Sequence, residues 1–336
     1  MTDTIVDVTA DTVPARVAVV TPARVLIALI RREFWEHRAL WIVPLVTAAI
    51  LVCLAAVAHF GAGANGGTPF GPFNSRSDGA PVADLHAIGV ALASIRQWAV
   101  SVPLFLATFV MLFFYLLSSL YDERKDRSIL FWKSLPVSDS ATVISKLLVA
   151  TVLVPLGVFL VWIATTVLVT AVWDARRAMG LVAGPPFVWD TVAWLKVDAL
   201  MLTLVVMSSL WYAPVFAYLM LISAWARRNP FLWAVLPPLL LAVTERIAFG
   251  SSYLGRLFGA RLAGVLTSLG VNDPEGGAFS GAMLQTPAGK LPSLPAVFDL
   301  LDYRQLLANI DLWIGVAVAV ALVYAAIRVR RYRDDT

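Results

Sequence analysis

The sequence predicts an all-α integral membrane protein with about six transmembrane helices, and two observations carry that prediction. Of the 336 residues, 60% are apolar and only 14% are charged, and the mean hydropathy is +0.80. A soluble domain usually carries about 25% charged residues. The apolar residues also lie in runs as long as the roughly 20 residues of helix that cross a hydrocarbon core. These runs lack the alternation of a membrane β-barrel, whereas helices satisfy their backbone polar groups internally, as lipid requires.

Six segments have the length and composition of membrane spans. Several contain a proline, such as Pro103 and Pro155, and kinks at these positions are compensated by neighbouring helices. The predicted spans are residues 39–60, 99–120, 147–173, 195–225, 231–249 and 306–327.

The basic residues predict the orientation of these spans. Most of the 26 Lys and Arg residues lie near helix ends before the first span and after the second, fourth and sixth. Because Lys and Arg are retained on the cytoplasmic side, both termini are expected inside. Residues 1–23 lack the ordered regions of a cleavable signal peptide, and we predict a disordered cytoplasmic tail there. Residues 24–336 are then one transmembrane domain in the inner membrane.

The remaining connections, residues 61–98, 174–194 and 250–305, lie outside in this topology. The first is rich in glycine and typical of a flexible loop. The last contains SSYLGRLFGARLAGVLTSLG, which we predict to be helical, with a small residue at every fourth position from Ser251 to Ala263. Such a stripe permits close helix contact, either in packing at the outer membrane surface or along an exit path.

The composition also argues against several kinds of site. The single Cys53 excludes an intrachain disulfide and a cysteine-based zinc site, and His37, His59 and His86 are scattered. Topology accounts for the basic residues behind the formal charge of +4, so we expect no nucleic-acid partner. The segment PAGKL lacks the earlier glycine and the final Ser or Thr of a phosphate-binding loop. We therefore predict that the chain is no enzyme, binds no cofactor and hydrolyses no ATP itself.

An amphipathic segment, residues 24–41, precedes the first span. Apolar residues recur at helical spacing in RVLIALIRREFWEHRALW, with Arg and Glu between them. A helix of this kind lies in the membrane interface. It is either a simple anchor for the first span or an elbow helix that also contacts a cytoplasmic partner. Its apolar positions are Ile27, Ile30, Phe34 and Trp35.

The loop between the second and third spans, residues 121–146, combines dense charge with an apolar run. Topology explains its Lys and Arg residues, but not consecutive apolar side chains outside the hydrocarbon core. Pro136 ends this first helix, and Ser138 or Asp139 can cap the next. An exposed apolar helix suits a docking element, so we favour protein docking over surface anchoring. The apolar run consists of Ile129, Leu130, Phe131 and Trp132.

This loop resembles the coupling loop of type-2 ABC exporter permeases. In that family an acidic-basic pair precedes a Gly-Thr-Leu-Glu-like run, several apolar residues and a Pro-hydrophobic-Ser step. Here Glu123–Arg124 matches the pair, Ser128–Ile129 the Thr-Leu step, and Pro136–Val137–Ser138 the ending. The resemblance implies that this coupling helix docks on an ATPase, through Glu123, Arg124, Arg127, Ser128, Ile129, Leu130, Phe131, Trp132 and Pro136.

The match has one further agreement and two departures. Lys146 matches a Lys at the start of the third span, whereas Arg127 replaces the usual glycine and Leu130 the usual carboxylate, as in a divergent branch. The order of spans, elbow helix and long outer segment also fits. The resemblance implies a bacterial inner-membrane exporter in which two permeases, identical or homologous, join two cytoplasmic ATP-binding subunits that use ATP and Mg. The expected cargo is amphipathic: a peptide, a drug or a lipid-like molecule.

Charged residues also occur at membrane depth. Glu245 and Arg246 lie at the predicted outer end of the fifth span, and Asp311 reaches a similar height in the sixth. Because ionised groups at this depth cost a few kcal/mol unless paired or near water, we predict that Arg246 pairs with Asp311 or Glu245 near the outer mouth. This pair is either a structural salt bridge or a substrate contact. Lys196 and Asp198, near the outer start of the fourth span, have the same two interpretations.

Two other classes of protein remain alternatives. A secondary transporter that works without an ATPase usually holds ionisable residues or broken helices near the bilayer midplane, whereas here the charges lie toward the edges. An intramembrane enzyme would need a cluster of His, Asp, Glu, Ser or metal ligands, and the sequence suggests none.

Overall fold

The computed structural model describes most of the chain and has the predicted all-α architecture. The described residues are 21–57, 67–68, 71–72, 82–126, 137–182, 190–263, 283–286, 289–299 and 301–332. Within them, six helices are long and apolar enough to cross a membrane, which confirms the predicted fold class. The protein is therefore a multi-pass membrane protein.

The first three helices form the elbow and the first two spans. α1 (Pro22–Glu36) begins with a proline, whose missing N–H is harmless in the first turn of a helix. α2 (Ala39–Val57) follows after a short break. α3 (Val82–Ser119) starts well before residue 99, the predicted start of the second span. Hydropathy marks only the part of a helix that lipid can surround, so it missed this extension.

The third span is one long helical run with a local defect. The short α4 (Tyr121–Lys125) precedes it, and the run itself comprises α6 (Asp139–Leu148), η1 (Val149–Leu153) and α7 (Val154–Ala178). η1 is a single turn of π-helix. Pro155 follows directly and has no N–H for the carbonyl four residues earlier, so the helix widens at this point.

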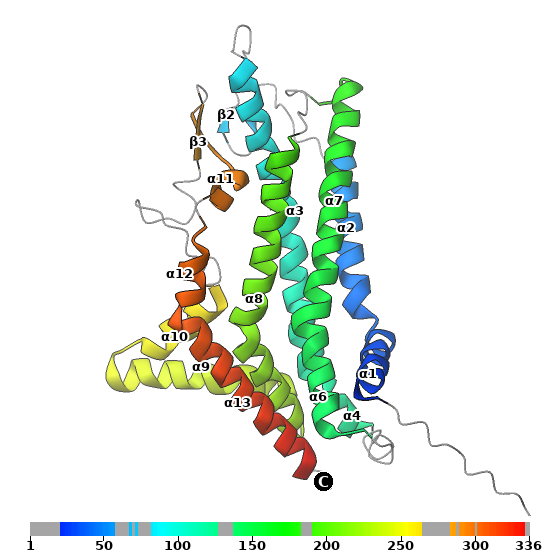
Figure 1. The fold of residues 1–336 in the computed structure, drawn as a ribbon. Coiled ribbons are helices and arrows are strands. Elements are labelled where there is room, and N and C mark those ends of the chain that lie inside the picture. The colour runs from blue at the N-terminus through cyan, green and yellow to red at the C-terminus, as the bar shows by residue number, and fades with distance from the viewer. Residues whose placement is uncertain are drawn as a thin grey trace, which may run out of the picture.

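The next two helices are joined by a tight turn. Asp190 caps α8 (Thr191–Trp225) by accepting a hydrogen bond from a backbone N–H in the first turn. α9 (Pro230–Phe249) is apolar on all sides, and Ala234 is its one buried residue. Figure 1 shows α9 lying across the lower end of α8 rather than alongside it. A helix that is apolar all round and exposed within its own chain is suited to lipid.

The C-terminal part combines short elements with the last span. α10 (Tyr253–Ala263) is the helix predicted in the long segment after the fifth span. α11 (Leu294–Asp299) and α12 (Tyr303–Ala308) precede α13 (Ile310–Tyr332), the last span. Two short antiparallel hairpins complete the described elements: β1 (Gly67–Thr68) with β2 (Gly71–Pro72), and β3 (Met283–Thr286) with β4 (Gly289–Pro292).

The core lies within a bundle of α2, α3, α7, α8 and α13. α13 packs on α8, while α2, α3 and α7 contact one another. Buried apolar side chains such as Leu104, Trp162 and Met220 fill the space between them. Figure 1 shows α1, α4, α6 and the end of α13 gathered at the lower end of this bundle. The chain therefore brings its first and last described helices to one end.

Candidate functional site

Four ionisable side chains from four helices meet inside the lower end of the bundle. Lys146 of α6 is 0% exposed, Glu33 of α1 1%, Arg330 of α13 4% and Glu123 of α4 6%. We call these four residues the buried charge cluster. Lys, Glu and Arg are almost never so fully buried unless they are paired. Their burial therefore depends on the contacts that they make with one another.

Lys146 stands at the centre of the cluster. Its Nζ lies 2.7 Å from Oε1 of Glu33 and 3.1 Å from Oε1 of Glu123. One ammonium group thus joins α6 to α1 and to α4. Each contact is a hydrogen bond or ion pair between charged groups, the kind that is about twice as strong as a neutral hydrogen bond.

Arg330 holds the end of the last span to the same cluster. Its Nη1 donates to Oε2 of Glu123 at 2.7 Å, and its Nε donates to Oδ1 of Asp139 at 3.0 Å. Nη2 of Arg32 also lies 3.6 Å from Oε1 of Glu123. The three carboxylates of Glu33, Glu123 and Asp139 thus face the three cations of Arg32, Lys146 and Arg330.

The pairing of these buried charges determines how the cluster affects stability and the movement of its helices. Removing a charge from water costs several kcal/mol, and a buried pair only roughly repays that cost. Breaking such a pair is expensive, about 3–5 kcal/mol, because it leaves an uncompensated buried charge. The cluster therefore adds little net stability, but it strongly resists any movement that separates α1, α4, α6 or α13.

Two aromatic side chains complete the surroundings of Glu33. The hydroxyl of Tyr115 in α3 donates to Oε2 of Glu33 at 2.9 Å. The ring of His37 stands edge-on to the ring of Tyr115, with 4.9 Å between their centroids, and its Nε2 lies 3.8 Å from Glu33 Oε2. Burial lowers the pKa of His37, although the charge of Glu33 opposes this shift. Through Tyr115, the cluster also contacts the second span.

Arg124 makes a separate connection next to the cluster. Its Nη2 donates to the carbonyl oxygens of Ser223 at 2.6 Å and Ala226 at 2.8 Å. The last carbonyls of a helix lack intrahelical partners, and an arginine near that end can satisfy them. The hydroxyl of Ser223 in turn accepts from the backbone N–H groups of Leu120 and Tyr121, each at 3.0 Å. α4 is thereby fastened to the end of α8.

The predicted coupling helix falls between these anchored elements. Glu123 and Arg124 precede it and make the internal contacts described above. After it, Ser138 caps α6 by accepting from Ala141 N at 3.2 Å, and Asp139 contacts Arg330. The other predicted docking residues lie outside the described residues: Arg127, Ser128, Ile129, Leu130, Phe131, Trp132 and Pro136. The described elements on the two sides of that segment, α4 and α6, thus both contact the buried charge cluster.

Part of the chain is similar to a known protein family. The family model described as ABC-2 family transporter protein matches residues 85–175, which include Tyr115, Glu123 and Lys146. The match covers 91 of the 336 residues, so it relates this segment, rather than the whole chain, to that family. Together with the six apolar helices, it supports a membrane permease of a transporter. No curated protein and no solved structure matches it.

The elbow helix of the permease has two different faces. Leu29 and Glu33 are buried, and Ile30 and Phe34 are partly buried against the core. Ile27 and Trp35 point away, with exposed fractions of 65% and 67%. The four predicted elbow residues therefore divide between packing inside the permease and an exposed surface.

The predicted outer-mouth pairing is not seen in the described part of the permease. The side chain of Arg246 is exposed and makes no hydrogen bond or ion pair with Glu245, Asp311 or any other described residue. Glu245 instead accepts from the backbone N–H groups of Tyr253 and Leu254, both at 2.7 Å, at the start of α10. A carboxylate is favourable there because the N–H groups of a first turn lack partners.

The structure places Asp311 and Lys196 beside residues for which the sequence made no prediction. The Asp311 carbonyl oxygen accepts from Arg261 Nη2 at 3.1 Å, so Arg261 takes the place expected for Arg246. Lys196 Nζ lies 2.7 Å from Asp299 Oδ2 and joins α8 to α11. The spacing of residues in the sequence does not show that α10 lies beside α13 or that α11 lies beside α8.

Sequence reasoning missed most of the buried charge cluster. Glu33 gave a usable signal, since it lies one helical turn from Leu29, Ile30 and His37 on the packed side of α1. Lys146 stood out only through the family resemblance. Arg330 lies among several basic residues that topology already explained, and nothing distinguished it from them. No group of three or more potential metal ligands occurs in the residues that the structure describes.

Proposed function

We propose that this permease is the membrane subunit of an ATP-binding-cassette exporter, which moves an amphipathic substrate outward with a separate ATPase subunit. It works with a second permease copy or a homologous permease in the bacterial inner membrane, with both termini in the cytoplasm. The observation that carries this proposal is the buried charge cluster, which joins α4 and α6, the described elements on either side of residues 127–136, to α1 and α13.

In this mechanism the loop receives a force and the cluster transmits it. The ATPase grips Ile129, Leu130, Phe131 and Trp132. When ATP closes the ATPase pair, the loop moves and pulls on α4 and α6. Because Lys146 and Glu123 resist separation from Glu33 and Arg330, α1 and α13 move with them as a unit. Rigid transmission of this kind supports reorientation of the permease pair.

The elbow helix has a matching place in this proposal. Arg24, Arg31 and Trp35 are exposed on α1, while Leu29 and Glu33 face the bundle. Basic and aromatic residues on one exposed face suit a helix that lies in the inner interface. The interface then supports α1, so that Glu33 holds Lys146 from a fixed position.

The test is co-purification of the tagged permease with an ATP-binding protein encoded beside it. Phe131→Asp and Trp132→Asp are expected to abolish the association but not membrane insertion. Tyr332→Asp is the matched control, because Tyr332 is an exposed aromatic at the same end of the bundle, 71% exposed, and lies outside the loop. Association that survives in both loop variants would contradict docking through this segment. Transport by the purified permease alone would favour the secondary-transporter alternative.

A further inference from the structure

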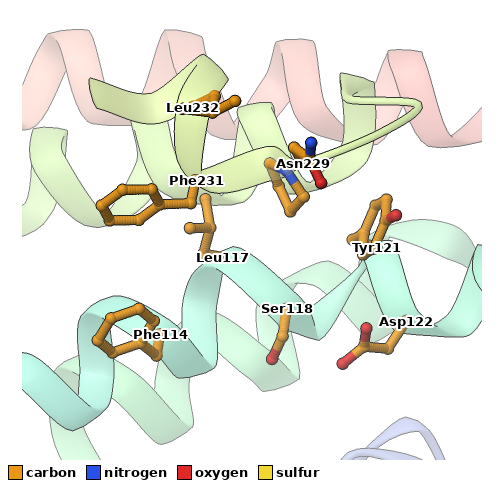
Figure 2. A pocket seen from close by; sticks show the side chains of 9 residues that line it. Phe114, Leu117, Ser118, Tyr121, Asp122, Asn229, Phe231 and Leu232 are labelled. Atoms are coloured by element: carbon orange, nitrogen blue, oxygen red, sulfur yellow. The ribbon is translucent and has the colours of Figure 1, made fainter. Parts of the chain in front are cut away.

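A cavity of about 410 Å³ opens between the second span and the start of α9. It lies beside the buried charge cluster but shares none of its four residues. Figure 2 shows its walls, which come from the last turns of α3, from α4 and from the first turn of α9. The lining residues are Phe114, Leu117, Ser118, Tyr121, Asp122, Asn229, Pro230, Phe231 and Leu232.

The cavity has an apolar half and a polar half. The rings of Phe114 and Phe231 lie nearly parallel, with centroids 6.3 Å apart and 14° between their planes, and Leu117 lies between them and the polar half. Tyr121, Asp122 and Asn229 group at the other side in Figure 2. A molecule that fills both halves must itself be amphipathic.

Asp122 supplies the one charge among the lining residues. Its carboxylate makes no hydrogen bond or ion pair with any residue that the structure describes. The basic residues nearest in sequence, among those that the structure describes, do not line the cavity. Arg124 donates to the carbonyls at the end of α8, and Lys125, Arg227 and Arg228 are exposed. A negative charge is therefore open to a ligand at the polar side.

The walls are held in place before any ligand arrives. The hydroxyl of Ser223 and the guanidinium of Arg124 fasten α4 to the end of α8. Asn229 then turns the chain into α9 with φ of 48°, a left-handed conformation that asparagine tolerates better than most residues. A preformed pocket binds more tightly because fewer groups must be ordered on binding.

We propose that this cavity binds an amphipathic cation. Its apolar body contacts Phe114, Leu117 and Phe231, and its positive group lies against Asp122 near the ring of Tyr121. A carboxylate and an aromatic face both attract a cation. An anion is repelled by Asp122, and a neutral molecule leaves that carboxylate without a partner. Export of such a cation as cargo rests on the proposed function, whereas binding of the cation to this cavity does not.

The experiment measures binding to the purified full-length permease in nanodiscs, with no ATPase present. Equilibrium dialysis compares a phenylbutyl-trimethylammonium ion with its uncharged isostere, in which carbon replaces nitrogen. Empty nanodiscs correct for partition into lipid. The cation is expected to bind saturably and more tightly than the isostere.

Two carboxylate variants make the test specific. Asp122→Asn is expected to weaken binding of the cation about tenfold, which corresponds to about 1.4 kcal/mol, and to leave the isostere unchanged. Asp126→Asn is the matched control, since Asp126 is exposed one turn further on and does not line the cavity. Phe231→Ala is expected to weaken both ligands.

The proposal is overturned if the cation does not saturate, if Asp122→Asn leaves its affinity unchanged, or if Asp126→Asn weakens it equally. Because no ATPase takes part, these outcomes are independent of the docking experiment. Loss of binding here would leave the ATPase result standing. Failure of ATPase docking would contradict the proposed exporter function but would not affect the proposed cation site.

Discussion

Lys146 shows how much can depend on a single buried ammonium group. It is fully buried, and its partners belong to α1 and α4, which both precede it in the sequence. Glu123 has Arg330 as a second strong partner, whereas the further partners of Glu33 among the described residues are the neutral hydroxyl of Tyr115 and the distant imidazole of His37. Loss of Lys146 therefore affects Glu33 most.

We expect Lys146→Met to lower the free energy of unfolding by about 3–5 kcal/mol, because Glu33 is left buried without a cation. Thermal or denaturant unfolding in detergent measures this loss. The double variant Glu33→Gln/Lys146→Met is expected to recover much of it, since both charges are then removed. Lys125→Met is the control for an exposed lysine on α4. Equal unfolding free energies for Lys146→Met and Lys125→Met would contradict the structural role.

The burial of His37 predicts how the free energy of unfolding depends on pH. Burial lowers its pKa below the ordinary value of about 6.5 for histidine, so the unfolded chain takes up a proton at a higher pH than the folded protein. Its contribution to stability is therefore complete above the unfolded pKa and is lost as pH falls through the lowered pKa. His37→Gln is expected to reduce the fall in unfolding free energy between about pH 7 and pH 5. An unchanged pH profile in this variant would rule out His37 as its source.

At the scale of elements, the side chain of Arg261 links α10 to two spans, beside the hydrogen bonds that Trp211 and Tyr212 donate to the carbonyls of Arg261 and Leu262. The guanidinium carbon of Arg261 lies 4.4 Å from the ring centroid of Trp211 in α8, and Nη2 donates to the carbonyl of Asp311 in α13. Gly315 makes room for this side chain, because a Cβ there would lie 1.5 Å from Nη2. The predicted stripe of small residues on α10 does not serve this contact: Gly255 and Gly259 face open space among the described residues.

We therefore expect Gly315→Ala to displace the Arg261 side chain without unfolding the permease, since the end of an arginine can move. Amide hydrogen exchange in α10 should become faster, and Arg261→Ala should have the same effect. Gly157→Ala is the matched control, because nothing lies within 4 Å of a Cβ at that helical glycine. Unchanged exchange in α10 in both test variants would show that other contacts hold this helix.

At the scale of the whole molecule, the buried charge cluster joins the first and last described helices, α1 and α13, to α4 and α6, which flank residues 127–136. Arg330 lies far from Glu123 and Asp139 in sequence, yet it contacts both. A rigid cluster between moving elements allows docking and transport to be separated experimentally. Docking depends on the loop surface, whereas transmission depends on the buried contacts.

We expect Arg330→Gln to leave the ATPase bound to the permease but to reduce export several-fold, because Glu123 and Asp139 lose their connection to α13. Arg331→Gln is the control for an exposed arginine on the same helix. Co-purification and transport by the reconstituted complex are measured together. Transport that is reduced equally by both variants would indicate a general effect of surface charge. Full transport in Arg330→Gln would exclude transmission through this residue.

The sequence by itself determined the class of this protein and the number of its membrane-crossing helices. Long apolar runs have few alternatives in lipid, because every backbone polar group must be satisfied within the segment. The cap of α6, predicted at Ser138 or Asp139 and found at Ser138, and the helix α10 were likewise predicted, since both depend on local residues. The family resemblance of the loop was local too, and the family match includes this part of the chain.

Only the tertiary structure decided which charges face one another. Glu33, Lys146 and Arg330 come from distant parts of the chain, and hydropathy scores such residues only as interruptions or as topological signals. For the same reason, the sequence did not show that Arg261, rather than Arg246, lies beside Asp311. Burial and pairing of charges depend on how helices pack in three dimensions. The distance in space between two charged side chains cannot be read from the order of residues.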